Sequence, residues 1–117
     1  SLLNDASSRF NEGLLVNIVD LGANVLYLDA AYYVNLYTSS PGSYSFDNAT
    51  TPVCTSVDAG NGIGIGTGQV NSALCTTATL LPSANQNKYV FADAVYLTPS
   101  AHRQLGDYAY DRLRARW

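Results

Sequence analysis

Three side chains near the end of the chain are of types that could take part in acid–base chemistry. Asp93 lies three residues before Tyr96 and nine before His102, the only histidine. In a Ser-His-Asp site a carboxylate orients an imidazole, and the imidazole takes a proton from the nucleophile. A phenol is protonated at neutral pH and is a poor general base. The stretch therefore raises the question of which residue could be the base.

The elements around these residues are predicted from their local patterns. The segment "KYVFAD", residues 88–93, predicts a short strand or an extended entry that ends in Asp93. Thr98 followed by Pro99 gives an N-cap and a first helical residue, and the helix should run to about Arg116. An aspartate just after a strand stands where α/β folds place catalytic groups. The arginines in the last turns of this helix suit the negative end of its dipole.

The first forty residues predict a helix, a strand and a third element with two possible interpretations. Residues 2–21 carry apolar side chains at steps of three and four, and Gly22 can adopt a left-handed cap. The segment "NVLYLD", residues 24–29, is typical of a strand buried on both faces of a parallel sheet. Residues 30–40, "AAYYVNLYTSS", are either a short helix or a row of tyrosines that lines a surface groove.

A long excursion without a regular period occupies residues 43–87, where turn-forming residues dominate. Its run "GNGIGIGTG", residues 60–68, fits neither glycine-rich nucleotide-binding pattern and is expected to be a flexible or tightly turned loop. "NAT", residues 48–50, matches a glycosylation acceptor, a match that also arises by chance.

Two cysteines lie inside the excursion. A bridge between Cys54 and Cys75 would remove loop entropy worth about 3 kcal/mol and would fit an oxidising compartment. The alternative is two separate buried thiols. No apolar run is long enough to span a bilayer and no signal-peptide pattern opens the chain, so the chain is expected to be soluble and already processed.

The order of elements predicts an α/β fold that is incomplete. One or two strands between helices cannot form a stable parallel sheet, because their backbone groups and apolar faces stay uncovered. We therefore expect residues 1–117 to be the C-terminal part of a single domain, with a parallel sheet completed by an N-terminal part. The net charge of -3 gives no field that would attract nucleic acid, so this partner is not expected.

A family resemblance agrees with this expectation. "YVFADAVYLTPSAHRQLGDYAY" is similar to the last block of the GDSL or SGNH serine esterases and lipases, in which Asp-x-x-His-Pro-Thr precedes a helix. "RFNEGLL", "GANVLYLD", "PGSYSF" and the two cysteines follow the order of secreted and autotransporter-type bacterial esterases of that family. The resemblance implies a three-layer fold with a parallel sheet and covers nearly the whole chain.

The resemblance also implies roles for individual residues. Asp93 takes the position of the family aspartate, Tyr96 that of the histidine, Leu97 that of the proline and Thr98 that of the threonine. His102 matches an additional helix histidine, about one turn past the cap. The Gly-Asp-Ser block with the nucleophile is not in this chain. Three explanations of Tyr96 stay open: a natural loss of function, an engineered or misassigned position, or a site rewired to His102.

The sequence thus predicts the C-terminal chain of a nicked or two-chain esterase or lipase, secreted or at a bacterial cell surface. Its partner would be the N-terminal chain with the nucleophilic serine, its substrate a lipid or other acyl ester, and it would need no metal or organic cofactor. One alternative is a catalytically silent family member that binds acyl groups or glycans. Another is an independent, disulfide-bridged binding domain.

Overall fold

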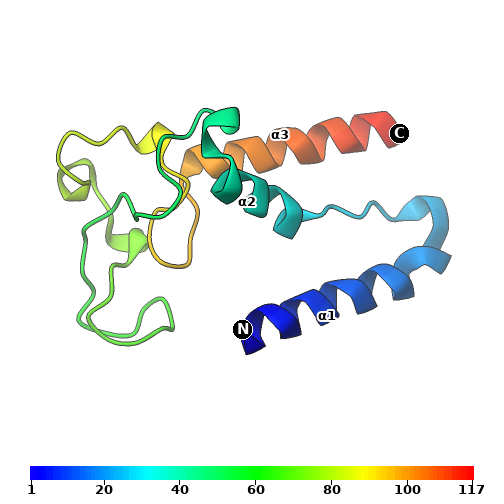
Figure 1. Cartoon of the computed structure of the whole chain (residues 1–117), viewed down its shortest axis with the longest axis horizontal. Helices are drawn as coiled ribbons and strands as arrows, with labels where there is room; N and C mark the ends of the chain where they lie inside the picture. Colours follow the sequence, from blue (N-terminus) through cyan, green and yellow to red (C-terminus); the bar gives the residue numbers. More distant parts are fainter.

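The computed structural model describes all residues, 1–117, and consists of helices joined by long irregular segments (Figure 1). The three α-helices are α1 (Leu2–Ile18), α2 (Ala30–Ser39) and α3 (Pro99–Arg116). Five short 3-10 helices accompany them: η1 (Val19–Asn24), η2 (Pro41–Tyr44), η3 (Ser72–Leu74), η4 (Thr77–Thr79) and η5 (Gln86–Lys88). No helix is both long enough and apolar enough to cross a membrane.

The expected α/β fold with a parallel sheet is wrong, because the structure contains no sheet. Residues 25–29 are not helical and form no bridge; the amide of Val25 reaches only the carbonyl of Gly22, at 3.5 Å. Lys88 ends η5, and residues 89–93 contain isolated bridges only, a parallel one from Tyr89 to Asn48 and an antiparallel one from Phe91 to Leu97. An apolar segment becomes a strand only where other backbones pair with it, and this chain supplies too few.

The helix that begins after Thr98 is confirmed. Thr98 is fully buried; its hydroxyl accepts the amide of Ala101 at 3.2 Å and donates to the carbonyl of Tyr89 at 2.7 Å. Pro99 occupies the first turn, where a missing N–H costs nothing. The N-cap thus fixes the start of α3 to the segment that carries Asp93.

Within residues 30–40, Ala30–Ser39 form the helix α2, and its tyrosines also line a hollow. Asp29 caps the helix by accepting the amide of Tyr32 at 3.0 Å. Tyr33 stacks on Tyr108 of α3 with 3.8 Å between ring centroids, and Tyr37 is almost fully buried. Both tyrosines line a shallow hollow of about 310 Å³ between the two helices. The segment is therefore both a short helix and a row of tyrosines that lines a surface hollow.

The buried core lies where α2, the excursion and the start of α3 meet. It consists of two small clusters, one made of Tyr37, Phe46, Ala49, Val90 and Ala101, the other of Val53, Cys54 and Ala92. The predicted bridge between Cys54 and Cys75 is confirmed, with 5.8 Å between the two Cα atoms. The disulfide and the core together hold the excursion in place.

The N-terminal helix stands apart from this core. No residue of α1 is buried, and several of its large apolar side chains are exposed, among them Leu2, Leu3, Phe10 and Val16. Gly22, within η1, has a φ of 65°. Figure 1 shows that the chain turns back between α1 and α2. The radius of gyration is 16.6 Å, whereas a compact chain of this length has about 13 Å. The accessible surface is 7890 Å², against about 6,200 Å² for a compact monomer of this mass.

Candidate acid–base site around Asp93

The loop that carries Asp93 is a tight turn between two extended segments. The amide of Ala92 donates to the carbonyl of Tyr96 at 2.8 Å, and the amide of Thr98 donates to the carbonyl of Val90 at 2.9 Å. On the other side, the amide of Cys54 donates to the carbonyl of Ala92 at 3.1 Å. Backbone pairing on both sides therefore fixes the position of residue 93.

The carboxylate of Asp93 is fully buried and surrounded by backbone donors. Oδ1 accepts the amides of Val95 at 2.8 Å and Tyr96 at 2.7 Å, and Oδ2 accepts the amide of Ser72 at 2.8 Å. Burial by itself would raise the pKa of Asp93, but hydrogen bonds from Tyr96, Ser72 and Val95 outweigh it and lower this pKa. Asp93 is therefore a buried carboxylate that stays ionised.

The structure does not bring the three candidate side chains together. Tyr96 touches Asp93 through its backbone amide, while its side chain is 53 % exposed. His102 is exposed on the first turns of α3, where its amide donates to the carbonyl of Thr98 at 3.0 Å. The hydrogen-bond donors to the Asp93 carboxylate come from residues 72, 95 and 96, and His102 is not among them. Position 96 is thus three residues from Asp93 in sequence, whereas His102 is nine residues away.

A cavity of about 510 Å³ lies beside this loop, a volume within the range of small-molecule sites. Its wall includes the disulfide, Ser72 and the stretch from Leu97 to Pro99. Asp93 itself does not line the cavity. The lining mixes apolar side chains with hydroxyls and an amide: Val53, Cys54, Ser72, Cys75, Thr76, Thr77, Leu80, Gln86, Ala92, Leu97, Thr98 and Pro99.

Sequence reasoning missed the residues of the excursion that support Asp93. Next to Ser72, the side chain of Asn71 donates to Asp58 at 2.8 Å and accepts the amide of Ala73 at 3.0 Å. Hydrogen bonds from Asn71 and Gly60 lower the pKa of Asp58. The contacts of Asn71 with Asp58 and of Ser72 with Asp93 join residues 13 and 21 positions apart, so no local period could indicate them; the Asp and Asn among the turn-formers were the only signal.

The glycine-rich run forms a turned loop at the end of an antiparallel bridge between Val57 and Val70. The amide of Gly68 donates to the carbonyl of Asp58 at 2.9 Å, and Gly64 and Gly66 have φ values of 78° and 125°. Glycine is the residue that adopts such values without strain. The prediction of a tightly turned loop is therefore confirmed.

Comparison of the chain with protein-family models, with curated proteins and with solved structures found no match.

Proposed function

We propose that this chain provides the aspartate loop of a serine ester hydrolase and acts together with a second polypeptide that carries the nucleophilic serine. The substrates would be carboxylic esters of lipids or similar acyl compounds, and the hydrolase would be secreted or displayed at a bacterial surface. The disulfide between Cys54 and Cys75 is compatible with that location.

The observation that supports this proposal is the environment of Asp93. A buried carboxylate with a lowered pKa stays negative at neutral pH, and such a group can orient an imidazole and stabilise its protonated form. Position 96 follows Asp93 by three residues, and Tyr96 is 53 % exposed. A base at this position would therefore be open to a substrate and to a serine from a partner chain.

A second candidate function is the binding of acyl groups or glycans without turnover. Tyr96 stands where the resembling family has its histidine, and both oxygens of Asp93 already accept amides of this chain. The cavity next to the loop could then hold a ligand without a reaction. The two candidate functions differ in what a histidine at position 96 would do.

The first experiment is Tyr96→His in the 117-residue chain, followed by NMR titration of the introduced imidazole. If the Asp93 carboxylate orients this position, its negative charge raises the imidazole pKa above the ordinary value of about 6.5. Adding Asp93→Asn should return it to that value. His102, assigned from the wild-type spectrum, is the internal control. An imidazole unaffected by Asp93→Asn would contradict the triad position of residue 96.

The second experiment measures turnover of a short-chain aryl ester by the chain together with its serine-carrying partner. Tyr96→His should raise turnover by about a hundredfold or more, because general bases contribute at least this much. His102→Ala should have little effect. The opposite pattern, activity that His102→Ala abolishes and Tyr96→His leaves unchanged, would show a site rewired to His102. No turnover with either variant would favour the silent binder.

A further inference from the structure

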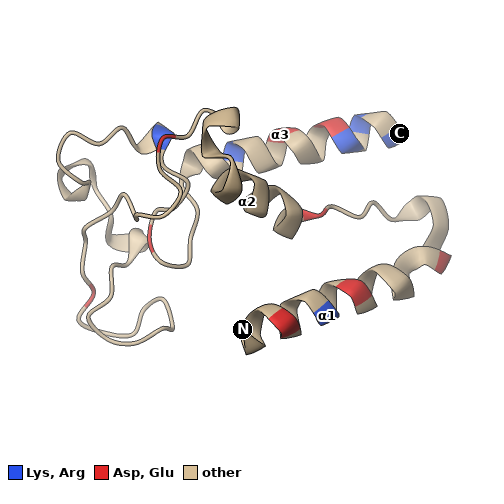
Figure 2. Ribbon diagram, viewed as in Figure 1, with Lys and Arg blue, Asp and Glu red and all other residues tan.

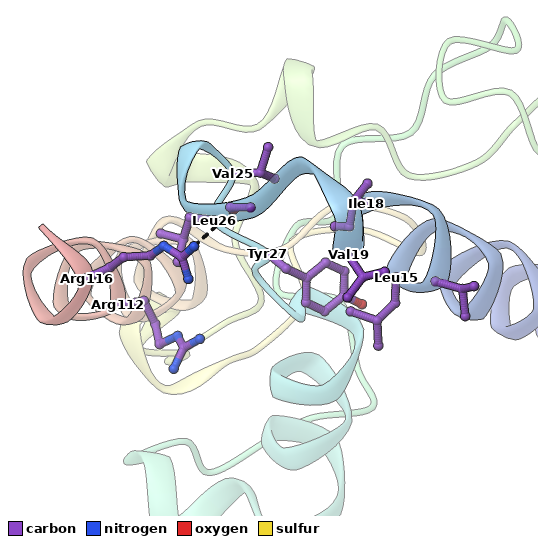
Figure 3. A pocket seen from close by; sticks show the side chains of 10 residues that line it. Leu15, Ile18, Val19, Val25, Leu26, Tyr27, Arg112 and Arg116 are labelled. Carbon is purple, nitrogen blue, oxygen red and sulfur yellow. Dashed lines mark hydrogen bonds between the residues drawn. The ribbon is translucent and has the colours of Figure 1, made fainter.

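The largest hollow of the molecule is an open groove between the end of α1 and the end of α3 (Figure 3). Its volume is about 590 Å³, within the range of small-molecule sites. The apolar wall comes from the last turn of α1, η1 and the extended segment that follows: Leu15, Val16, Ile18, Val19, Val25, Leu26 and Tyr27. Gly22, Arg112 and Arg116 complete the lining.

The two arginines make one side of this groove positively charged. Arg112 and Arg116 are four residues apart on α3, a spacing that puts them on one face of the helix. Nη2 of Arg116 donates to the carbonyl of Gly22 at 3.2 Å, which holds its guanidinium at the groove (Figure 3). No carboxylate of the chain lines the groove.

The charge of the surroundings does not cancel this feature. Figure 2 shows blue segments gathered at the C-terminal end of α3, with one red segment among them. Two acids neighbour groove residues in sequence, Asp111 next to Arg112 and Asp20 next to Val19, and neither lines the groove. The helix dipole explains why arginines stabilise this end of α3, but it does not explain why two of them border an apolar hollow.

We propose that this groove binds an amphiphile with one acyl chain and a carboxylate head group. A guanidinium matches a carboxylate with two parallel hydrogen bonds, and the apolar wall would remove the acyl chain from water. A cation would be repelled, and a polar sugar would leave the apolar wall uncovered. The inference does not depend on ester hydrolysis, since Asp93, Tyr96 and His102 do not line this groove.

The experiment is a calorimetric titration of the 117-residue chain with laurate below its micelle concentration. We expect saturable binding, weakened at least about tenfold by Arg112→Gln combined with Arg116→Gln, since a hydrogen bond to a charged group contributes that much. Arg103→Gln, on the same helix but outside the groove, should leave binding unchanged. Equal affinity in the double variant would overturn the proposal.

The apolar wall is tested with a matched pair of substitutions on α1. Leu15 lines the groove and is 50 % exposed, whereas Leu3 is 79 % exposed and lies outside it. Leu15→Asn should weaken laurate binding and Leu3→Asn should not. Because both side chains are exposed, neither change should unfold the core; circular dichroism checks this. Equal effects of the two substitutions would refute the groove as the site.

Probes that share only the carboxylate or only the apolar chain with laurate distinguish binding of an anionic amphiphile from other uses of the groove. Acetate and dodecyltrimethylammonium should bind far more weakly than laurate, because the first lacks the chain and the second has the wrong charge. Vesicles of phosphatidylglycerol should not retain the protein. Equal binding of dodecyltrimethylammonium, retention by vesicles without laurate binding, or self-association that laurate does not reverse would each overturn the proposal. The last result would mean that a second copy covers the groove.

Discussion

At the scale of single residues, Asp93 is a structural centre whatever chemistry it supports. Its two oxygens hold the amides of Val95 and Tyr96 within one turn and the amide of Ser72 from a segment 21 residues away. Hydrogen bonds to a buried charge are stronger than neutral ones, and a buried amide without its acceptor is costly. The excursion and the loop are therefore joined through one side chain.

We predict that Asp93→Asn lowers the free energy of unfolding by about 2 to 3 kcal/mol, because the amide group presents a donor to at least one of these N–H groups. Denaturation with urea measures the change. Asp47→Asn, on an exposed residue, is the control and should change stability little. A loss below about 0.5 kcal/mol would mean that the turn forms without the carboxylate.

The pH dependence gives a second readout of the same residue. The pKa of Asp93 is lower in the folded chain than its unfolded value of about 3.9. The stabilisation is therefore complete above that value and is lost as the pH falls through the folded pKa. As the pH falls below about 4, the wild type should lose stability more steeply than Asp93→Asn. Parallel profiles would contradict a lowered folded pKa.

At the scale of elements, α3 begins at a cap that has two functions. The Thr98 hydroxyl satisfies an amide of the first turn and also donates to the carbonyl of Tyr89. The cap thus orients the helix and closes the loop of Asp93. A threonine followed by proline indicated this start from the sequence alone, because capping depends on neighbouring residues.

We predict that Thr98→Val, which keeps the shape and removes the hydroxyl, destabilises the protein by about 2 kcal/mol. The change removes a cap worth about 1 kcal/mol and leaves a buried carbonyl without its donor. Thr98→Ser should retain most of the stability. Thermal unfolding followed by circular dichroism compares the two variants. If valine and serine had the same effect, the methyl group rather than the hydroxyl would be the important part.

How far the sequence predicted each element depended on the range of its interactions. The cap of α3, the glycine turn and the disulfide involve near neighbours or paired cysteines, and these were foreseen in whole or in part. The cap of α2 was not foreseen, because Asp29 was assigned to the preceding strand. The strand at residues 24–29 was wrong because an apolar run shows that a segment avoids water, not that another backbone pairs with it. The contact of Ser72 with Asp93 could not be foreseen, since nothing local in the excursion indicates it.

At the scale of the whole molecule, stability is unevenly distributed. Only 11 of 117 residues are buried, and all of them lie between Tyr37 and Ala101. The helix α1 has no buried residue, and most of the stability of a helix in a protein comes from tertiary packing, which α1 lacks. The two ends of the molecule should therefore differ in how readily they open.

We predict that hydrogen exchange separates these regions. The amides of Val90, Ala92 and Thr98, which donate within the core, should exchange slowest, while those of α1 should exchange within seconds to minutes. Exchange measured by NMR or mass spectrometry tests this order. Laurate should slow exchange in the last turn of α1 if the groove binds it. Protection of free α1 equal to that of Val90 would contradict the exposed helix.

The glycine-rich loop has a consequence for how the chain could be cut or extended. The loop is closed at its base by hydrogen bonds between Asp58 and residues 68 and 69, and the disulfide from Cys54 to Cys75 lies outside this base. A protease that cuts between Gly62 and Gly66 would therefore leave two pieces that remain covalently joined. Exposed loop tips of small residues are also the sites that accept inserted sequence best. A peptide epitope or a small fluorescent domain could thus be placed there, with the disulfide keeping both flanks in register.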